Sequence, residues 1–336
     1  MATTIIESRA ELGSHMKYPL ATRRYAAPLA ALIGTALTLQ SYAIPGPPPG
    51  TGAGSTLPEV SVIAPRAVTP DELAGASVSN FVTAHARPSP ASGQLARWRS
   101  PVCVSTLGLT PGFNSFVSER IAAIATSVGA PVGAANCKPD IHIYFTSDPQ
   151  ALATGVAKQL PLLLGYHYVS ETKNLAVMRH PIEGWYATAT EGDKGGIQLD
   201  DPMVLNTEAP GTGAGLLQSK TPPARLGTRL TTGRSSLLVH ALLLVDIHKV
   251  TGYEIGPIAD YLAMLVLSQT RQQDACGQLP SILDLMAPEC NRDKPTAVTA
   301  GDLAFLRALY ASDLRTSYYM EKGSLEGKVL AELAPH

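Results

Sequence analysis

Two strands that alternate with two helices constrain the fold of this chain more than any other feature. Val102–Leu107 alternates and is rich in β-branched residues, and Ile141–Phe145 is a short apolar run, so both are predicted as strands. Asn114–Val128 has apolar residues at helical spacing, and Asp148–Leu164 begins with an Asp-Pro pair that favours a helix start. A helix that connects two strands of one sheet makes a crossover, so the two strands are expected to be parallel.

The later part of the chain predicts more strands and then mostly helices. Leu237–Lys249 is the longest apolar run of the body and is expected to be a central strand. Leu175–Arg179 and Trp185–Thr190 are expected to form a hairpin around the sequence HPIEG. Helices are predicted at 257–270, 281–286, 299–312 and 321–333. Because a mixed β-sheet with an N-terminal βαβ unit comes first and C-terminal helices come last, we expect an α+β fold.

A stretch without charged residues predicts export. No Asp, Glu, Lys or Arg occurs between Arg24 and Glu59. The apolar segment Tyr25–Ile44 follows a basic cluster and contains the small-x-small sequence Ser41-Tyr42-Ala43. These are the three parts of a secretory signal peptide, and cleavage is expected after Ala43. An uncleaved membrane anchor is the alternative, but the Pro, Gly and Thr residues within the segment make it a poor span.

This interpretation divides the chain into four segments. Residues 1–15 are expected to be an upstream extension or a cloning remnant, and residues 16–43 the signal peptide. Residues 44–93 are a Pro/Gly-rich linker and N-terminal segment, with a short helix predicted at Asp71–His85. Residues 94–336 are expected to be a single α+β domain. The protein is therefore predicted to be periplasmic or secreted, with no membrane span after signal cleavage.

The cysteines agree with export. Four are present after the signal segment, at positions Cys103, Cys137, Cys276 and Cys290. An even number in an exported chain favours two disulfides, for which three connectivities are possible. We expect pairing between sequence neighbours, Cys103 with Cys137 and Cys276 with Cys290. A zinc site is the alternative, but the sequence has no CxxC pair.

Charge and motifs exclude several function classes. The chain has 26 Lys and Arg residues against 27 Asp and Glu, so its net charge is −1. A nucleic-acid partner is not expected, because such a protein normally has a basic excess. The sequence also has no G-x-S-x-G elbow and no Walker A loop, which argues against an α/β-hydrolase and a P-loop NTPase.

The last third of the chain carries residues that resemble a known family. It contains the segments IADYLAMLVLSQ, LPSILDLM and VTAGDLAFLRALY, in this order. They resemble the catalytic half of metzincin metallopeptidases, the matrixin-like ones in particular, in which a helix with HExxHxxGxxH precedes a Met-turn and another helix. The chain also resembles uncharacterised exported proteins of Gram-negative bacteria. The resemblance implies a zincin-like fold.

The chain departs from that family at the zinc ligands. Aligned with HExxHxxGxxH, the helix has Ala259 and Ala263 in place of the first two histidines, Asp260 at the general base and Gln269 at the third ligand. Methyl groups cannot coordinate zinc. The resemblance therefore implies a zincin scaffold without its zinc-binding histidines, in which Ala259 and Ala263 face a cleft. No metal and no cofactor are expected.

Three residues are candidates for binding, and none is assigned a catalytic role. Asp260 and Gln269 follow from the resemblance, and His142 lies on the strand predicted at Ile141–Phe145. Each has a structural alternative. A histidine in an apolar strand is often a hydrogen-bonded core residue, and a carboxylate in apolar surroundings needs a partner such as Arg or Lys.

Two function classes remain open. The first is an exported non-catalytic binding or scaffold protein on a degenerate zincin-like fold, with an unknown protein or peptide partner in the cell envelope. The alternative is an exported, peptidase-like hydrolase with an unrecognised, zinc-independent site, over which the long loop Lys194–Arg234 could lie. A weaker option is an assembly partner of the cell envelope, tethered through its Pro/Gly-rich linker.

Overall fold

The computed structural model describes residues 68–69, 73, 75–192, 196–200, 232–270 and 272–334. The chain divides into two units, Met1–Ser55 and Thr56–His336, and all described residues belong to the second. The predicted extension and signal peptide, the linker as far as residue 67 and most of the loop Lys194–Arg234 lie outside the described residues.

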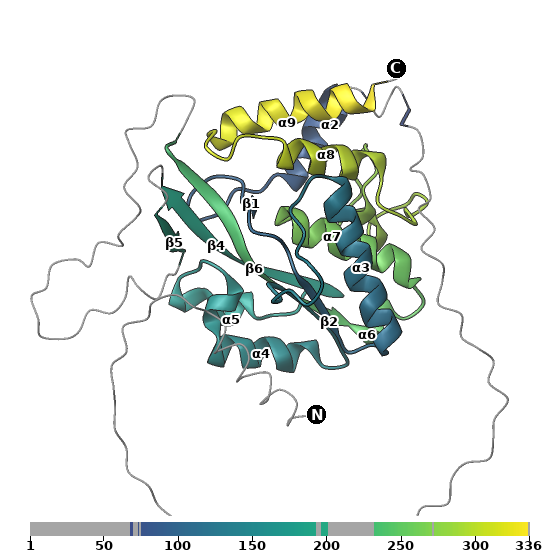
Figure 1. Cartoon of the computed structure of the whole chain (residues 1–336). Coiled ribbons are helices and arrows are strands. Elements are labelled where there is room, and N and C mark those ends of the chain that lie inside the picture. Colours follow the sequence, from purple (N-terminus) through teal and green to yellow (C-terminus); the bar gives the residue numbers. More distant parts are fainter. Residues whose placement is uncertain are drawn as a thin grey trace, which may run out of the picture. The chain divides into compact units, whose positions relative to one another are not determined.

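A mixed β-sheet forms the centre of the described unit (Figure 1). Its strands follow the order β2-β3-β6-β4-β5, and the short β1 pairs with β6. β1, β2, β3 and β6 are parallel, whereas β4 is antiparallel to both β6 and β5. The strands are β1 (Arg97–Trp98), β2 (Val104–Leu107), β3 (Ile141–Thr146), β4 (Ile182–Gly192), β5 (Ile197–Leu199) and β6 (Arg234–Asp246). This confirms an α+β fold with a mixed sheet, a parallel strand pair near its start and a central strand from the longest apolar run.

Prolines lie at the boundaries of α3 and α4, the helices before and after β3. α3 (Pro111–Ser127) connects β2 to β3. α4 (Pro149–Gln159) begins at Asp148, whose carboxylate accepts a hydrogen bond from Ala151 N at 3.0 Å. The single helix predicted to Leu164 is wrong, because Pro161 interrupts it and starts the 3₁₀ helix η1 (Pro161–Leu164).

The predicted hairpin is also wrong. Leu175 ends the short helix α5 (Thr172–Leu175), which follows the 3₁₀ helix η2 (Val169–Glu171), and residues 176–181 form no strand. β4 pairs along its length with β6 and continues through a short connection into β5. The apolar residues after Leu175 lie in a loop that packs against one face of the sheet. Their hydrophobicity therefore reflects burial and not a strand.

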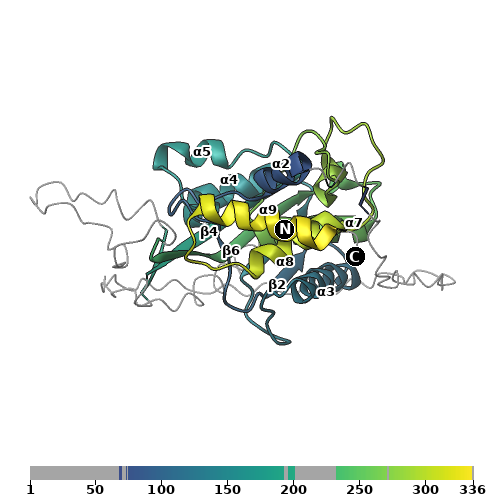
Figure 2. The same ribbon diagram turned by 90° about the horizontal axis from the view of Figure 1, so that it is seen from above.

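Helices cover both faces of the sheet. The larger core lies between one face and the helices α2, α3, α7, α8 and α9, and a smaller core lies between the other face and α4, η1 and α5. Figure 2 shows α3 and α4 on opposite sides of the strands. Alternate residues of β3 supply the two cores: Ile141, Ile143 and Phe145 point to the larger one and Tyr144 to the smaller.

The folded domain begins earlier than the predicted boundary at Gln94. α2 (Gly75–His85) buries Val78, Phe81 and Val82 in the larger core, where it also contacts α9. The apolar face of this helix therefore makes it part of the packed domain rather than of a linker.

Four helices near the C-terminus follow the order expected from the sequence: α7 (Ile255–Ser268), the 3₁₀ helix η4 (Ile282–Met286), α8 (Ala300–Tyr310) and α9 (Tyr318–Leu333). The strand predicted at Leu237–Lys249 ends earlier than expected, because Asp246 caps the short helix α6 (Ile247–Val250) by accepting a hydrogen bond from His248 N at 3.0 Å. α8 starts with a capping box: Asp302 N donates to Thr299 Oγ1 at 3.1 Å, and Thr299 N donates to Asp302 Oδ2 at 2.9 Å.

Two disulfides close loops of the domain. Cys103 bonds to Cys137 with a Cα–Cα distance of 5.9 Å, and Cys276 bonds to Cys290 with a Cα–Cα distance of 5.1 Å. This confirms the expected pairing between sequence neighbours. In the part of the chain that the structure describes, no helix combines the length and apolarity needed to cross a membrane.

Candidate functional site

The helix that resembles the zinc-binding segment of metzincins is a core helix. Ala259 and Ala263 are both fully buried, and every residue of α7 from Pro257 to Ser268 is buried. The resemblance implied that these alanines face a cleft, whereas they lie in the larger hydrophobic core. The zincin-like resemblance therefore stays a prediction from the sequence.

Asp260 forms a buried ion pair, which is the structural alternative that its apolar surroundings in the sequence suggested. Its carboxylate accepts two hydrogen bonds from Arg120, from Nε at 2.5 Å and from Nη2 at 2.9 Å, and a third from Val298 N at 2.8 Å. The side chain is 1% exposed. This buried ion pair connects α7 to α3 and to the segment before α8, and hydrogen bonding to the carboxylate raises the pKa of Arg120. Asp260 thus has the contacts of a packing residue.

Gln269 and His142 lie elsewhere, so the structure does not bring the three candidates together. Gln269 ends α7 in a left-handed conformation with a φ of 49°. His142 points from β3 to the face of the smaller core, where its ring stacks on His240 of β6 at a centroid distance of 5.2 Å. His142 is the register partner of Leu242, so His240 is its diagonal neighbour, two residues away on the same face of β6, and no signal in the sequence indicates this contact.

The surroundings of the stacked histidines favour their neutral forms. His240 is 8% exposed, and neither of its ring nitrogens has a hydrogen-bond partner among the described residues. Burial, together with the neighbouring His142, lowers the pKa of His240 to about 3. Burial also lowers the pKa of His142. The described residues include no group of three His, Cys, Asp or Glu side chains that could hold a metal ion.

A serine–histidine contact in the larger core is closed to substrates. His85 Nε2 lies 3.1 Å from Ser281 Oγ, which donates to Asp302 Oδ1 at 2.7 Å. None of the three side chains is more than 2% exposed. The group joins α2, η4 and α8, and burial lowers the pKa of His85 to about 4. Its role is therefore to connect these elements.

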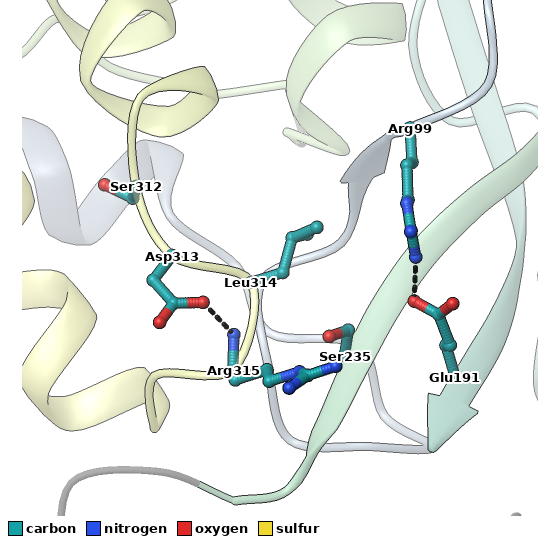
Figure 3. Close-up of a pocket in the computed structure, with 7 residues that line it drawn as sticks. All are labelled: Arg99, Glu191, Ser235, Ser312, Asp313, Leu314 and Arg315. Atoms are coloured by element: carbon teal, nitrogen blue, oxygen red, sulfur yellow. Dashed lines mark hydrogen bonds and ion pairs between the residues drawn. The ribbon is translucent and has the colours of Figure 1, made fainter. Parts of the chain in front are cut away.

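An open pocket lies at the end of the sheet where β4 finishes and β6 begins, and it is our candidate site (Figure 3). Its volume is about 340 Å³, within the range of small-ligand sites. Four segments of the chain form it: the residue after β1, one residue each of β4 and β6 that pair at one rung of the ladder, and the connection between α8 and α9. The lining residues are Arg99, Glu191, Ser235, Ser312, Asp313, Leu314 and Arg315.

The rung and the arginine beside it form the floor of the pocket. Glu191 and Ser235 are register partners across β4 and β6, and both are buried. Arg99 makes an ion pair with Glu191, and its side chain remains 56% exposed. The alternation of the strand places Glu191 on the floor, and pairing with Arg99 supplies the partner that a buried carboxylate needs.

The opposite wall, residues 312–316, is held through its backbone carbonyls. Arg97 Nη2 donates to Ser312 O at 3.3 Å, and Gln94 Nε2 donates to Leu314 O at 3.4 Å and to Thr316 O at 3.2 Å. Thr232 N donates to Arg315 O at 2.9 Å. Backbone held at successive positions keeps its shape, so the wall is already in place without a ligand.

A buried ion pair supports the wall from behind. Arg97 Nη1 lies 2.5 Å from Glu321 Oε1 of α9, and the two side chains are only 3% and 2% exposed. Arg97 therefore connects the wall, the strand β1 and the last helix. Burial raises the pKa of Glu321, whereas the Arg97 charge opposes that rise.

Unused hydrogen-bond donors outnumber unused acceptors in the pocket. The Arg315 guanidinium makes no hydrogen bond to another described residue, and Arg99 makes an ion pair only with Glu191. Asp313 Oδ1 accepts from Arg315 N at 2.9 Å, which leaves its second oxygen. A guanidinium offers a fork of N–H groups that matches an oxyanion. The pocket can therefore bind a negatively charged or acceptor-rich group.

Sequence reasoning did not identify this pocket. Its residues come from four separate segments, and their juxtaposition depends on the β4–β6 register and on the path of the α8–α9 connection. Comparison with protein-family models, with curated proteins and with solved structures finds no match.

Proposed function

We propose that this chain is an exported binding protein, and that a protein or peptide partner in the cell envelope occupies the pocket formed by Arg99, Glu191, Ser235 and Ser312–Arg315. The observation that carries the proposal is the preformed wall of this pocket. A rigid polar pocket with unused donors favours binding, because little conformational entropy is lost when a ligand enters.

Export is supported by the disulfides and by the signal-like segment. Disulfides persist in oxidising compartments such as the periplasm or the extracellular medium. The segment Tyr25–Ile44 supplies the expected route.

Binding is favoured over hydrolysis by the chemistry of the lining. A serine hydrolase needs a base within hydrogen-bond reach of its hydroxyl. The residues that line the pocket include no histidine or lysine, and the buried Glu191 is already paired with Arg99. The exported hydrolase is therefore the second candidate, and its activity would have to come from another part of the chain.

The proposal can be tested by blocking the pocket. Leu314→Trp places a larger side chain in the pocket without removing the carbonyl that Gln94 holds, and Ser324→Trp places the same side chain on the exposed face of α9. Binding of the oxidised full chain to an array of random tetrapeptides would be measured, with melting temperatures as the check on folding. We expect Leu314→Trp to abolish binding and Ser324→Trp to leave it intact. Equal binding by both variants, or no binding by the parent protein, contradicts the proposal.

A further inference from the structure

The charges in the pocket narrow the class of ligand. We infer that the pocket recognises a single carboxylate, that of the free C-terminal end of a peptide, with Arg315 as its main partner and Arg99 as the second. This inference rests on the proposed function and specifies its ligand. Both arginines carry guanidinium nitrogens that no described residue uses, and the two approach the pocket from different walls (Figure 3).

Arg315 is held in position by its own backbone. Its N–H donates to Asp313 Oδ1, and its carbonyl accepts from Thr232 N, so the peptide unit on each side of Arg315 is fixed. Ser235, whose hydroxyl lines the pocket, adds a further donor on the floor. The Arg315 side chain is exposed and its guanidinium is free to turn toward a ligand, so together with the Ser235 hydroxyl it can donate to the two oxygens of one carboxylate.

The two acids of the pocket favour a carboxylate over a phosphate. Glu191 and Asp313 balance Arg99 and Arg315, so the four side chains sum to no net charge. A singly charged carboxylate can replace water on the arginines with modest repulsion from these acids. For a dianionic phosphate the repulsion from the acids and the attraction to the arginines both double and largely cancel, whereas the cost of removing its hydration rises more steeply with its charge. Inorganic phosphate is thus expected to bind more weakly.

The size of the pocket and its position fit the end of a chain. A volume of about 340 Å³ holds a few residues rather than a folded partner. The floor is a rung near the end of the β4–β6 ladder, so a peptide can approach from the solvent side while its carboxylate reaches the arginines. An internal acidic side chain offers the same carboxylate, and the experiment separates the two sources.

The test uses two matched pools of N-acetylated random tetrapeptides without Asp or Glu, one with free C-terminal carboxylates and one with C-terminal amides. Equilibrium dialysis against the oxidised full chain, with detection by mass spectrometry, measures retention. We expect the free-acid pool to bind about tenfold or more tightly than the amide pool, as for hydrogen bonds to charged groups. A third pool, amidated but with internal Glu, is expected to bind like the amides. Equal retention of the free-acid and amide pools overturns the inference, and preference for the Glu pool assigns the site to an acidic side chain instead.

Variants connect the preference to the named residues. Arg315→Ala is expected to remove the preference for the free acid, whereas Arg179→Ala, an exposed arginine at the other end of β4, is expected to keep it. Asp313→Asn keeps an oxygen for Arg315 N while removing a negative charge, so it is expected to tighten free-acid binding about two- to fivefold. Competition by inorganic phosphate at the affinity of the free-acid pool contradicts the choice of a carboxylate.

The outcome also separates this inference from the proposed function. If both pools are retained equally and Leu314→Trp abolishes their retention, the pocket binds peptides but does not distinguish the free carboxylate. If neither pool shows retention that Leu314→Trp removes, the proposed function fails as well.

Discussion

His240 is a buried side chain whose surroundings connect folding to pH. It stacks on His142 between β6 and β3, and neither ring nitrogen has a described partner. A neutral imidazole is tolerated there, but a charged one would lack both water and a hydrogen-bond partner. The folded protein therefore keeps His240 neutral under conditions in which an unfolded chain would protonate it.

The first prediction concerns this histidine. Burial lowers the pKa of His240 from 6.5 to about 3, so the folded state binds fewer protons than the unfolded state between these values. Its contribution to stability is present above pH 6.5 and is lost as the pH falls. Between pH 7.5 and pH 5 the loss amounts to about 2 kcal/mol. His240→Leu should remove this part of the pH dependence, measured as the urea unfolding free energy at both pH values.

Other buried groups titrate in the same range, so the variant must be compared with its parent. Burial raises the pKa of Asp140 to about 6, and a carboxyl with a raised pKa gives stability that is lost as the pH rises. The difference between His240→Leu and the parent cancels this opposing contribution. His248→Gln, on the exposed side of α6, is the control for removing a histidine. Parallel pH profiles of parent and His240→Leu would show that the buried imidazole does not govern acid sensitivity.

At the scale of elements, α7 organises the domain because all of its sides are covered. Its residues contact α3, η4 and α8, and the Arg120–Asp260 pair fixes its rotation against α3. The sequence predicted the helix within two residues at each end, since its apolar run and its Gly-Pro start are local signals. The sequence could not show which residues would surround it, so the alanines at 259 and 263 suggested a cleft where there is a core.

The second prediction tests this element. Asp260→Ala leaves a buried guanidinium and an unpaired Val298 N–H, and we expect it to lower the unfolding free energy by about 3–5 kcal/mol. Arg120→Met combined with Asp260→Leu removes both charges and should cost less than the sum of the two single variants. Urea denaturation of the parent protein, Arg120→Met, Asp260→Leu and the double variant measures the coupling, and the same method measures the loss in Asp260→Ala. Additive effects, or a loss below about 1 kcal/mol for Asp260→Ala, would contradict the role of the pair.

At the scale of the whole molecule, the two disulfides connect the stability of the domain to the redox state of its surroundings. The Cys276–Cys290 bridge spans 14 positions and the Cys103–Cys137 bridge 34, which corresponds to about 3 and 4 kcal/mol in the chain-entropy description. Domains are stable by only about 5–15 kcal/mol in total. The two bridges therefore supply a large share of the stability.

The third prediction follows from this share. Each double replacement, Cys103→Ser with Cys137→Ser or Cys276→Ser with Cys290→Ser, should lower the unfolding free energy by about 3–4 kcal/mol under oxidising conditions. Dithiothreitol should lower the stability of the parent protein and should not change the stability of a variant in which all four cysteines are replaced by serine. Calorimetry with and without reductant measures both effects. A parent protein whose melting temperature does not respond to reductant would contradict the dependence on an oxidising compartment.

Local signals and long-range packing explain what the sequence could and could not predict. Strand β6 and helices α7 and α8 were predictable because each depends on nearby residues, such as Thr299 and Asp302 at the start of α8. The disulfide pairing was predictable because each cysteine bonds to its neighbour in the sequence. The hairpin after Leu175 and the domain start at Gln94 were wrong, because apolar side chains there pack as a loop and as α2. The pocket was not predictable at all, since Arg99, Glu191 and Arg315 meet only through tertiary contacts.

We propose that this protein binds its partner in the pocket beside the α8–α9 connection. Hydrogen–deuterium exchange of the oxidised full chain, with and without the free-acid tetrapeptide pool, can locate the bound ligand. We expect slower exchange at residues 312–316 and at the Glu191–Ser235 rung, and no such change for Leu314→Trp. Protection confined to other segments, such as α4 and α5, or no protection anywhere, would contradict it.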